Sequence, residues 1–311
     1  MKVYVGVDGG GTYTRALAFR EDGAPFKEAR SGPSNWQAVG LETAVRMVQE
    51  AVQEAAGLQP AGVGACLAGV DLPEDEERLA IPLREALGCD VRVDNDIIAA
   101  VHAAPGDPCG VVSSGTGAAV ALRQGSTVAR LLALNDYTGP IGGAGDIVTQ
   151  ALRAAILAAQ GAAPATVLSE EIPRAFGLKD YVALARATES REMPAWQVAL
   201  IVAPLCAQAA ATGDAVAAAI LAAQGRALGQ TSGRFFTARG LPQDASIALH
   251  GSLLRGGPPM YRSAFEEGLR EHLRNARTAA DGLSAVLGAA LYAASCFGVP
   301  AEPLRAMTRE H

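Results

Sequence analysis

The stretch VGVDGGGTYTRALAF, residues 5–19, decides how the fold of this chain is predicted. Three consecutive glycines and a threonine follow a short apolar run, and residues 13–20 again have the pattern of a strand. We therefore predict strands over 2–8 and 13–20 that flank a glycine turn. Glycine lets a backbone approach a ligand closely, and successive exposed N–H groups in such a turn can bind an anion. Taken alone, a plain hairpin explains the stretch equally well.

Neither common phosphate-binding pattern fits this turn, because a Walker A loop needs a lysine after its last glycine and a Rossmann turn needs a helix there. The neighbouring sequence strengthens the case for a ligand. Asp8 ends the first strand, where its carboxylate could hold a hydrated magnesium ion, and the hydroxyls of Thr12 and Thr14 lie at the same turn. A second small-residue turn, SSGTG, occupies 113–117, and a strand ending in VDND occupies 93–96 between the two turns.

Composition limits the class of protein. A chain of 311 residues is long enough for two domains or for two lobes of one domain, and 50% apolar with 19% charged residues is typical of a globular protein. The net charge is -6 with no basic block, which argues against nucleic-acid and membrane-surface partners. No apolar run reaches the roughly 20 residues that span a bilayer. The chain enters a strand at once with no signal segment, so we expect a cytoplasmic protein.

The cysteines are isolated along the sequence and include no C-x-x-C pair, so local spacing favours neither a zinc nor an iron–sulfur site. We predict that they are buried, reduced thiols. They are Cys66, Cys89, Cys109, Cys206 and Cys296.

The order of elements predicts an α/β protein with two similar lobes and a cleft between them. Residues 109–134 repeat the strand–turn–strand pattern of the N-terminus, which indicates an internal duplication. We place the first lobe at 1–108 and the second at 109–311, with the last helix able to pack back on the first lobe. The other predicted strands are 25–31 and 62–70, a strand within 91–104 that ends in polar residues and turns into a helix, and a strand within 245–254 that is followed by a small-residue turn. The other predicted helices are 41–56, a helix that begins at Pro73, 146–160, 194–211, 214–229, 260–274 and 284–297.

These motifs, in this order, resemble the actin–hexokinase–Hsp70 superfamily, and within it the N-acetylglucosamine kinase and BadF/BadG/BcrA/BcrD ATPase branch. GVDGGGTYTRALAF resembles the first phosphate motif of that branch, SGTG (114–117) the second, and LHGSL (249–253) its adenosine turn. GPSNW (32–36) resembles its sugar-contacting loop, and AAATGD (209–214) its alanine-rich segment. The resemblance implies a two-lobed, ribonuclease H-like ATPase fold that binds ATP with Mg²⁺.

The resemblance also implies site residues. Asp8 is expected beside the magnesium ion, and Asp96 is expected to act as the general base on an acceptor hydroxyl, although a helix N-cap is its other explanation. The implied nucleotide-binding residues are Gly10, Gly11, Thr12, Thr14, Gly115, Thr116, Gly117, Gly251 and Ser252. The implied substrate-binding residues are Asn35, Trp36, Asp96 and Gly142. Trp36 is equally well explained as a buried anchor of helix 41–56. We expect Asp94, His102 and His250 to have no part in the chemistry, the histidines as satisfied core residues.

The chain departs from the kinase branch on the sugar side. The polar residues after the second phosphate turn are replaced by Ala118 and Ala119, and Gly143 and Ala144 replace the acids of the sugar-binding motif within DYTGPIGGAGD (136–146). Asp136 or Asp146 could compensate, but Asp146 is also explained as a helix N-cap.

We therefore expect an ATP-dependent kinase for a sugar hydroxyl, most simply of an amino sugar such as N-acetylglucosamine or glucosamine. The alternatives are a BadF-type ATPase that drives a partner, or a protein that binds nucleotide or sugar without turnover. A homodimer is common in the family and stays open. The sequence does not name the acceptor.

Overall fold

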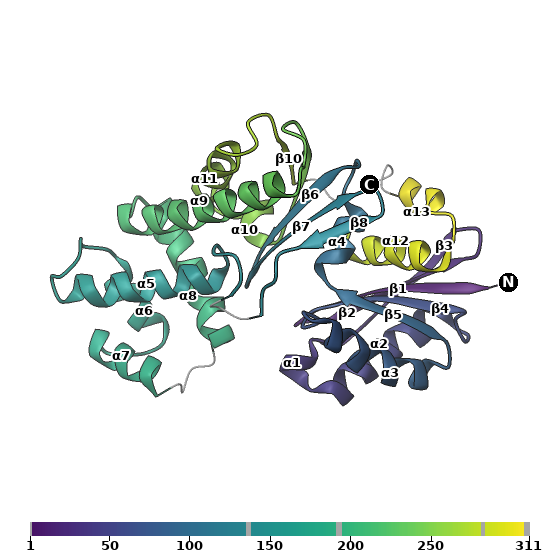
Figure 1. Cartoon of the computed structure of the whole chain (residues 1–311). Coiled ribbons are helices and arrows are strands. Elements are labelled where there is room, and N and C mark those ends of the chain that lie inside the picture. Colours follow the sequence, from purple (N-terminus) through teal and green to yellow (C-terminus); the bar gives the residue numbers. More distant parts are fainter. Residues whose placement is uncertain (1, 135–137, 191–194, 281–283, 308–311) are drawn as a thin grey trace. The chain divides into compact units, whose positions relative to one another are not determined.

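A computed structural model of the chain describes residues 2–134, 138–190, 195–280 and 284–307. The contacts divide the chain into two compact units. Unit 1 contains residues 1–107 together with 282–311, and unit 2 contains residues 108–281 (Figure 1). The C-terminal segment, which contains the helix predicted as able to pack back on the first lobe, thus groups with unit 1. The units are described separately below.

Unit 1 is built on a five-stranded mixed sheet with the order β3-β2-β1-β4-β5. Its first three strands form an antiparallel meander, and β4 and β5 run parallel to β1. The strands are β1 (Val3–Gly9), β2 (Thr14–Arg20), β3 (Pro25–Ser31), β4 (Gly62–Leu67) and β5 (Asp90–Asn95). The described helices of this unit are α1 (Trp36–Val39), α2 (Leu41–Ala56), α3 (Pro73–Leu87), α4 (Ile97–Ala103), α12 (Ala285–Phe297) and α13 (Glu302–Ala306).

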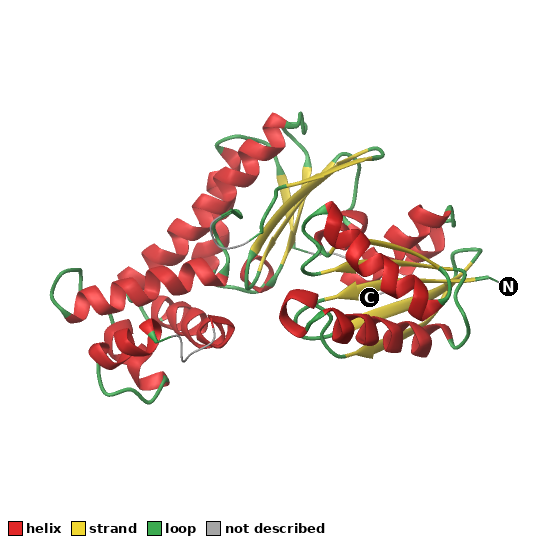
Figure 2. Ribbon diagram, turned by 60° about the horizontal axis from the view of Figure 1, so that its bottom comes forward, coloured by secondary structure: helices red, strands yellow, loops and turns green. Residues whose placement is uncertain are grey.

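Both faces of this sheet are covered by helices (Figure 2). Alternate residues of β1, namely Val3, Val5 and Val7, are buried in a core that they share with α2 and α3. On the other face Leu17 and Phe19 of β2 pack in a second core with α12. Because side chains alternate along a strand, the same strands supply both cores.

Three glycines bring α12 close to its neighbours in unit 1. A Cβ on Gly6 of β1 would collide with the backbone of α12 at Ala290, and one on Gly64 of β4 would lie 2.6 Å from the Cα of Ala293. A Cβ on Gly288 of α12 would collide with the carbonyl oxygen of Ala99 in α4. Small residues therefore set the positions of α12 and α4, and α4 is the helix that follows Asp96.

Unit 2 has a second five-stranded sheet with the order β10-β9-β6-β7-β8. Read from β8, this order and its strand directions repeat those of unit 1. Strands β6, β7 and β8 form an antiparallel meander, and β9 and β10 run parallel to β6. The predicted internal duplication is confirmed in the strand order of the two sheets. The strands are β6 (Cys109–Ser114), β7 (Ala118–Gln124), β8 (Thr127–Arg130), β9 (Ser246–His250) and β10 (Arg277–Ala279).

The helices of unit 2 share one large core with its sheet. Alanine and glycine let α9 and α11 pack closely: a Cβ on Gly225 or Gly229 of α9 would collide with the carbonyl oxygens of Tyr261 or Phe265 on α11. The described helices are α5 (Ala144–Ala159), α6 (Leu168–Ala175), α7 (Tyr181–Glu189), α8 (Ala195–Ala211), α9 (Ala215–Ala238), α10 (Ser252–Arg255) and α11 (Pro259–Arg270).

Among the residues that the structure describes, no single helix has the length and apolarity needed to cross a membrane. Two consecutive helical segments have the required length and apolarity only when they are taken together, and the chain bends by 115° between them. They are Val198–Ala211 and Ala215–Ala238. Cys66, Cys109 and Cys206 are buried and Cys89 is partly buried, as predicted, whereas Cys296 is exposed. All five are free thiols.

Candidate functional site

The glycine turn between β1 and β2 presents an exposed tip. The N–H of Gly10 donates to the carbonyl oxygen of Tyr13 (3.1 Å) and closes the turn. Gly11 and Thr12 are exposed, and neither their N–H groups nor the Thr12 hydroxyl has a hydrogen-bond partner among the described residues. Two consecutive exposed N–H groups are the arrangement that binds anions.

Thr14 holds two loops of unit 1 together and is not placed to make the predicted contact with a nucleotide. Its side chain is fully buried, and its hydroxyl lies 2.8 Å from the carbonyl oxygen of Gly32 and 2.7 Å from the Oγ of Ser34. The carbonyl oxygen of Gly10 in turn accepts hydrogen bonds from the N–H groups of Ser34 (3.0 Å) and Asn35 (3.2 Å). Thr14 therefore fastens the loop that follows β3 against the glycine turn and offers no group to a ligand.

Asp8 lies near the carboxyl end of β1. In the sheet it is paired with Arg15 of β2 on one side and with Cys66 of β4 on the other. Its carboxylate is 17% exposed and lies 3.4 Å from the Nη2 of Arg15. Burial raises the pKa of Asp8 above its usual value, and Arg15 offsets this only in part. A half-buried carboxylate whose charge is incompletely compensated is suited to a cation.

The second turn, between β6 and β7 in unit 2, repeats these features. The N–H of Gly115 donates to the carbonyl oxygen of Gly117 (2.9 Å), which closes the turn. The carbonyl oxygens of Gly115 and Thr116 accept hydrogen bonds from the first residues of α5, Ala144 (2.9 Å) and Gly145 (3.2 Å). The N–H groups of Thr116 and Gly117 have no partner within the described chain, and both residues are exposed.

The glycines at these two tips have no structural reason within the described chain. Gly11, Gly115 and Gly117 all lack a positive φ, so the unusual dihedral angles that only glycine tolerates are not used. A Cβ added to any of the three would meet no atom within 4 Å. Neither backbone conformation nor packing within the described chain therefore requires glycine at these positions.

The predicted adenosine turn follows β9. Gly251 has φ +80°, and a Cβ there would collide with the backbone of Ser114, so both its conformation and its packing require glycine. Ser252 is exposed and begins α10. The turn therefore fixes where α10 starts, whether or not it contacts a nucleotide.

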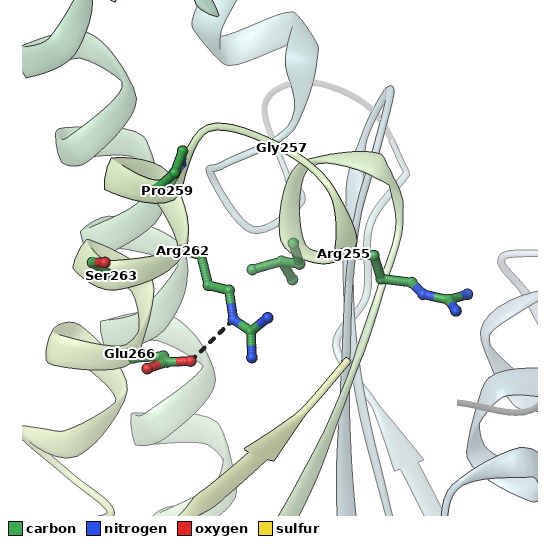
Figure 3. Close-up of a pocket in the computed structure, with 7 residues that line it drawn as sticks. Arg255, Gly257, Pro259, Arg262, Ser263 and Glu266 are labelled. Carbon is green, nitrogen blue, oxygen red and sulfur yellow. Dashed lines mark hydrogen bonds and ion pairs between the residues drawn. The ribbon is translucent and has the colours of Figure 1, made fainter. Parts of the chain in front are cut away.

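A hollow of about 350 Å³ lies between α10 and the first turns of α11 (Figure 3). The guanidinium of Arg262 points into it, and its Nε donates to the carboxylate of Glu266 (3.1 Å). Glu266 also accepts hydrogen bonds from Arg270 (3.2 Å) and Thr278 (2.9 Å), and these contacts lower its pKa although burial opposes them. Neither Gly251 nor Ser252 lines the hollow.

The structure contradicts the predicted contact of Gly142 with substrate. Gly142 is buried with φ +125°, and its carbonyl oxygen accepts hydrogen bonds from Ser114 (2.7 Å) and Tyr261. Its N–H donates to the Oδ2 of Asp146 (2.8 Å), which also accepts from Gly143 (3.0 Å). Both backbone groups are thus used inside unit 2. Asp146 stabilises the start of α5, as its other explanation proposed, and Asp136 lies outside the described residues.

The loop predicted to contact the sugar is held by its own side chains. Asn35 caps the short helix α1, because its Oδ1 accepts the N–H of Gln37 (3.1 Å). The indole Nε1 of Trp36 donates to the carbonyl oxygen of Gly69 (2.7 Å), and the guanidinium of Arg78 lies 4.9 Å from its ring centroid. Trp36 also packs on the core of unit 1. The observed contacts of Trp36 are those of an anchor.

Asp96 begins α4 but does not cap it. The first N–H of that helix, at Ile97, is accepted instead by the Oδ1 of Asn95 (3.1 Å), and the Asp96 side chain makes no capping hydrogen bond. Asp96 is exposed at the carboxyl end of β5, whereas Asn95 is buried. The N-cap explanation for Asp96 is therefore wrong. Asp94 precedes Asn95 in β5 and so lies on the opposite face of that strand from Asn95; its Oδ1 accepts the N–H of Asn95 (2.8 Å).

Sequence reasoning missed a second carboxylate beside Asn95. Asp71 follows β4, and its Oδ1 accepts a hydrogen bond from the Nδ2 of Asn95 (3.1 Å). Gln37 donates to its Oδ2 (3.3 Å) and to the carbonyl oxygen of Gly69 (3.3 Å). The signal was present, because LAGVD (67–71) places glycine and aspartate at the carboxyl end of a buried strand, where ligand sites of parallel sheets occur.

The two histidines differ from one another. The His102 ring packs edge-on against Tyr292, with centroids 5.5 Å apart. His250 is not the satisfied core residue that was predicted, because its Nε2 is buried and has no hydrogen-bond partner among the residues that the structure describes. Burial, together with the nearby charge of Arg255, lowers the pKa of His250 to about 4.

Comparison with known proteins supports the fold. A protein of Chromobacterium violaceum provisionally assigned as an N-acetylglucosamine kinase has a TM-score of 0.73 at 24% identity, over 94% of this chain and 99% of its own. The ROK family glucokinase of Streptomyces griseus, solved with glucose and AMPPNP, has a TM-score of 0.57 at 19% identity, over 94% and 98%. The predicted actin-like ATPase fold is confirmed.

One relative is similar in sequence over a shorter range. The chain is 42% identical over 82 residues to the glucosamine kinase GspK of Vibrio cholerae, an alignment that covers 24% of this chain and 28% of that relative. A family model, by contrast, matches nearly the whole chain, from residue 5 to residue 293, and so includes both exposed turns, Asp96 and the adenosine turn. The chain belongs to the BadF/BadG/BcrA/BcrD ATPase family.

Proposed function

We propose that the chain is an ATP-dependent kinase that phosphorylates a hydroxyl of an amino sugar, such as glucosamine or N-acetylglucosamine. The observation that supports the proposal is the repeated turn. Each tip has two exposed N–H groups without a partner among the described residues, and glycines that neither conformation nor packing requires there. The relatives named as glucosamine and N-acetylglucosamine kinases support the acceptor class.

In this proposal the turn at Gly10, Gly11 and Thr12 and the turn at Gly115, Thr116 and Gly117 bind the phosphates of ATP. Phosphoryl transfer needs mainly positioning and neutralisation of charge, and backbone N–H groups supply both without a lysine. Gly251 and Ser252 are proposed at the adenosine end.

Asp8 is the proposed partner of Mg²⁺. Among the described residues no three His, Cys, Asp or Glu side chains gather into a metal-binding cluster. Magnesium in phosphoryl-transfer enzymes is usually held by one or two carboxylates together with substrate phosphates and water, so a lone, half-buried Asp8 fits the ion. When bound, the ion would neutralise charge on the phosphates.

Asp96 is the proposed general base. Since Asn95 caps α4, Asp96 is not needed for that purpose, and an exposed carboxylate at a strand end is suited to take the proton of an acceptor hydroxyl. Such a base contributes a rate factor of roughly 10²–10⁴. Asn35 and Trp36 are proposed at the acceptor side, Asn35 through its side chain and Trp36 through the loop that it anchors.

The test is an ATP-consumption assay with purified protein and Mg²⁺ over hexoses, amino sugars and N-acetyl amino sugars, including a reaction without acceptor. We expect consumption to require an amino sugar and to yield its phosphate by mass spectrometry. Equal rates with and without acceptor would contradict the kinase and favour a BadF-type ATPase. No consumption, together with no rise in Tm at millimolar ATP, would contradict both enzymes.

A further inference from the structure

The hollow between α10 and α11 lies within unit 2, and no residue of the two exposed turns lines it. Its volume of about 350 Å³ falls within the range of roughly 300–1,000 Å³ that is usual for small-molecule sites. Leu254 and Pro259 supply apolar surface, and α11 supplies the polar side chains Arg262, Ser263 and Glu266 (Figure 3). Since the adenosine turn does not line it either, the hollow is separate from the residues proposed to bind ATP.

Arg262 is held with its guanidinium in the hollow. Its Nε donates to the Oε1 of Glu266 (3.1 Å), one turn further along α11, and its side chain is 37% exposed. No other described residue accepts a hydrogen bond from this guanidinium, so its two terminal nitrogens are free to donate to a ligand. A guanidinium that is anchored through Nε presents its terminal N–H groups as a fork that matches two phosphate oxygens.

Glu266 orients Arg262 without cancelling the positive charge around it. Its Oε1 also accepts from Thr278 of β10 (2.9 Å), and its Oε2 accepts from Arg270 (3.2 Å). Burial opposes ionisation, but these hydrogen bonds lower the pKa of Glu266, so two arginines share one negative charge. Arg255 adds positive charge at the rim of the hollow. Its guanidinium points away from Arg262 (Figure 3) and has no carboxylate partner among the described residues.

We infer that the hollow binds a small organic phosphate monoester, with Arg262 as its principal contact. The surplus of positive charge in a chain of net charge -6 favours an anion at this place. A phosphate monoester has a charge of about -1.5 to -2 and three acceptor oxygens, so it neutralises the surplus more fully than a carboxylate does. The apolar surface of Leu254 and Pro259 suits the carbon skeleton of an ester and has no use for a free phosphate ion.

This site goes beyond the proposed kinase reaction and does not depend on it. A sugar kinase forms a phosphate monoester as its product, so a ligand of this class would be present wherever the reaction runs. Leu254 and Arg255 belong to α10, which begins directly after Gly251 of the adenosine turn. A ligand in the hollow therefore contacts the helix whose start this turn fixes.

Isothermal titration calorimetry on the full chain tests the site. A non-hydrolysable ATP analogue and Mg²⁺ are present throughout, so that the exposed turns are occupied in the proposed enzyme. The probes are glucose 6-phosphate, inorganic phosphate and glucose. We expect glucose 6-phosphate to bind with a Kd of roughly 1 mM or lower, inorganic phosphate to bind at least about 5-fold more weakly, and glucose to give no Arg262-dependent binding.

Two variants of α11 and one control locate the binding. Arg262→Gln removes the charged fork and should weaken binding of glucose 6-phosphate by at least about 10-fold. Ser263→Phe fills the hollow from an exposed position and keeps every charge, so it should weaken binding as well. Arg274→Gln removes an exposed positive charge of unit 2 that does not line the hollow, and it should leave Kd within about 2-fold.

The outcomes separate this site from the kinase, because binding is measured without turnover. Weaker binding in both α11 variants but not in Arg274→Gln supports the inference, whether or not any sugar is phosphorylated. If Arg262→Gln does not fold, Ser263→Phe, which keeps the contacts of Glu266, decides alone. Unchanged binding in the folded α11 variants, an equal loss in Arg274→Gln, or no binding by the wild type overturns the inference. Equal affinity for inorganic phosphate and glucose 6-phosphate overturns the assignment to an ester.

Discussion

At the scale of single residues, Asn95 and Asp96 divide two tasks that one aspartate often combines. Asn95 is buried and satisfies the first N–H of α4, and Asp96 is exposed beside it. Local sequence could not separate these roles, because both residue types are good N-caps. The separation became visible only from the hydrogen bond to Ile97.

Replacing Asp96 tests its part in the reaction. We expect Asp96→Asn to fold with an unchanged Tm, to be stabilised by Mg²⁺ and ATP like the wild type, and to have a kcat lower by at least about 100-fold. Asn95→Ala is the comparison variant, because it removes the cap of α4 and should lower the Tm. Normal turnover by Asp96→Asn would place the base elsewhere.

His250 makes stability depend on pH. Its pKa falls from 6.5 to about 4 on folding, because the charged form is costly where the ring is buried near Arg255. Between these values the unfolded chain binds the proton more readily, so stability falls as pH decreases from 6.5 toward 4.

We expect His250→Leu to remove this contribution. The Tm difference between variant and wild type should move in favour of the variant as pH is lowered from 7.5 to 4.5, as followed by calorimetry. A difference that stays constant over this range would show that His250 does not titrate in this way.

At the scale of elements, most strands and both exposed turns were predictable because their signals are local, whereas the short strands β8 and β10 were not predicted. Alternation and small residues within a few positions define them. The misassigned residues are those whose partners lie far away in sequence: Gly142 is held by Ser114 and Tyr261, and Thr14 by Gly32 and Ser34. The hydrogen bonds that Gln37 and Asn95 donate to Asp71 were missed for the same reason.

The contact of α12 with α4 is testable at Gly288. A Cβ there would collide with the carbonyl oxygen of Ala99, so the two helices must separate. We expect Gly288→Ala to cost about 1–3 kcal/mol of stability, and to lower kcat because α4 begins beside Asp96. Thermal melts and the kinase assay would measure both effects.

Gly256→Ala is the matched control for this change. Gly256 has φ -141°, and its added Cβ would meet no atom of the described residues within 4 Å. Its Tm should match that of the wild type. A Gly288→Ala variant with the same Tm as this control would show that the helices accommodate the methyl group.

At the scale of the whole molecule, each unit has its own core, but only unit 2 is continuous in sequence. The sequence left open whether the last predicted helix packs back on the first lobe. A helix such as α12 is apolar all round, and its sequence does not reveal which of two similar sheets it covers. The close approach of α12 to Gly6 and Gly64, and the core that it shares with Leu17 and Phe19, identify its partner.

Fragments test this arrangement. We expect residues 108–281 to fold alone with a cooperative melt, whereas residues 1–107 should lack one because Leu17 and Phe19 lose their cover. Joining 1–107 to 282–311 through a flexible linker should restore cooperative melting, measured by circular dichroism. Cooperative folding of 1–107 alone would contradict the importance of α12.

The membership of α12 in unit 1 also reverses the usual order of events during synthesis, in which N-terminal domains fold first. Unit 2 is complete once residue 281 has left the ribosome, while the sheet made earliest still has one apolar face uncovered. The half of the protein that is translated first is therefore finished last. Until α12 packs on that face, Leu17 and Phe19 stay uncovered, and exposed apolar surface of this kind favours aggregation of a partly folded chain.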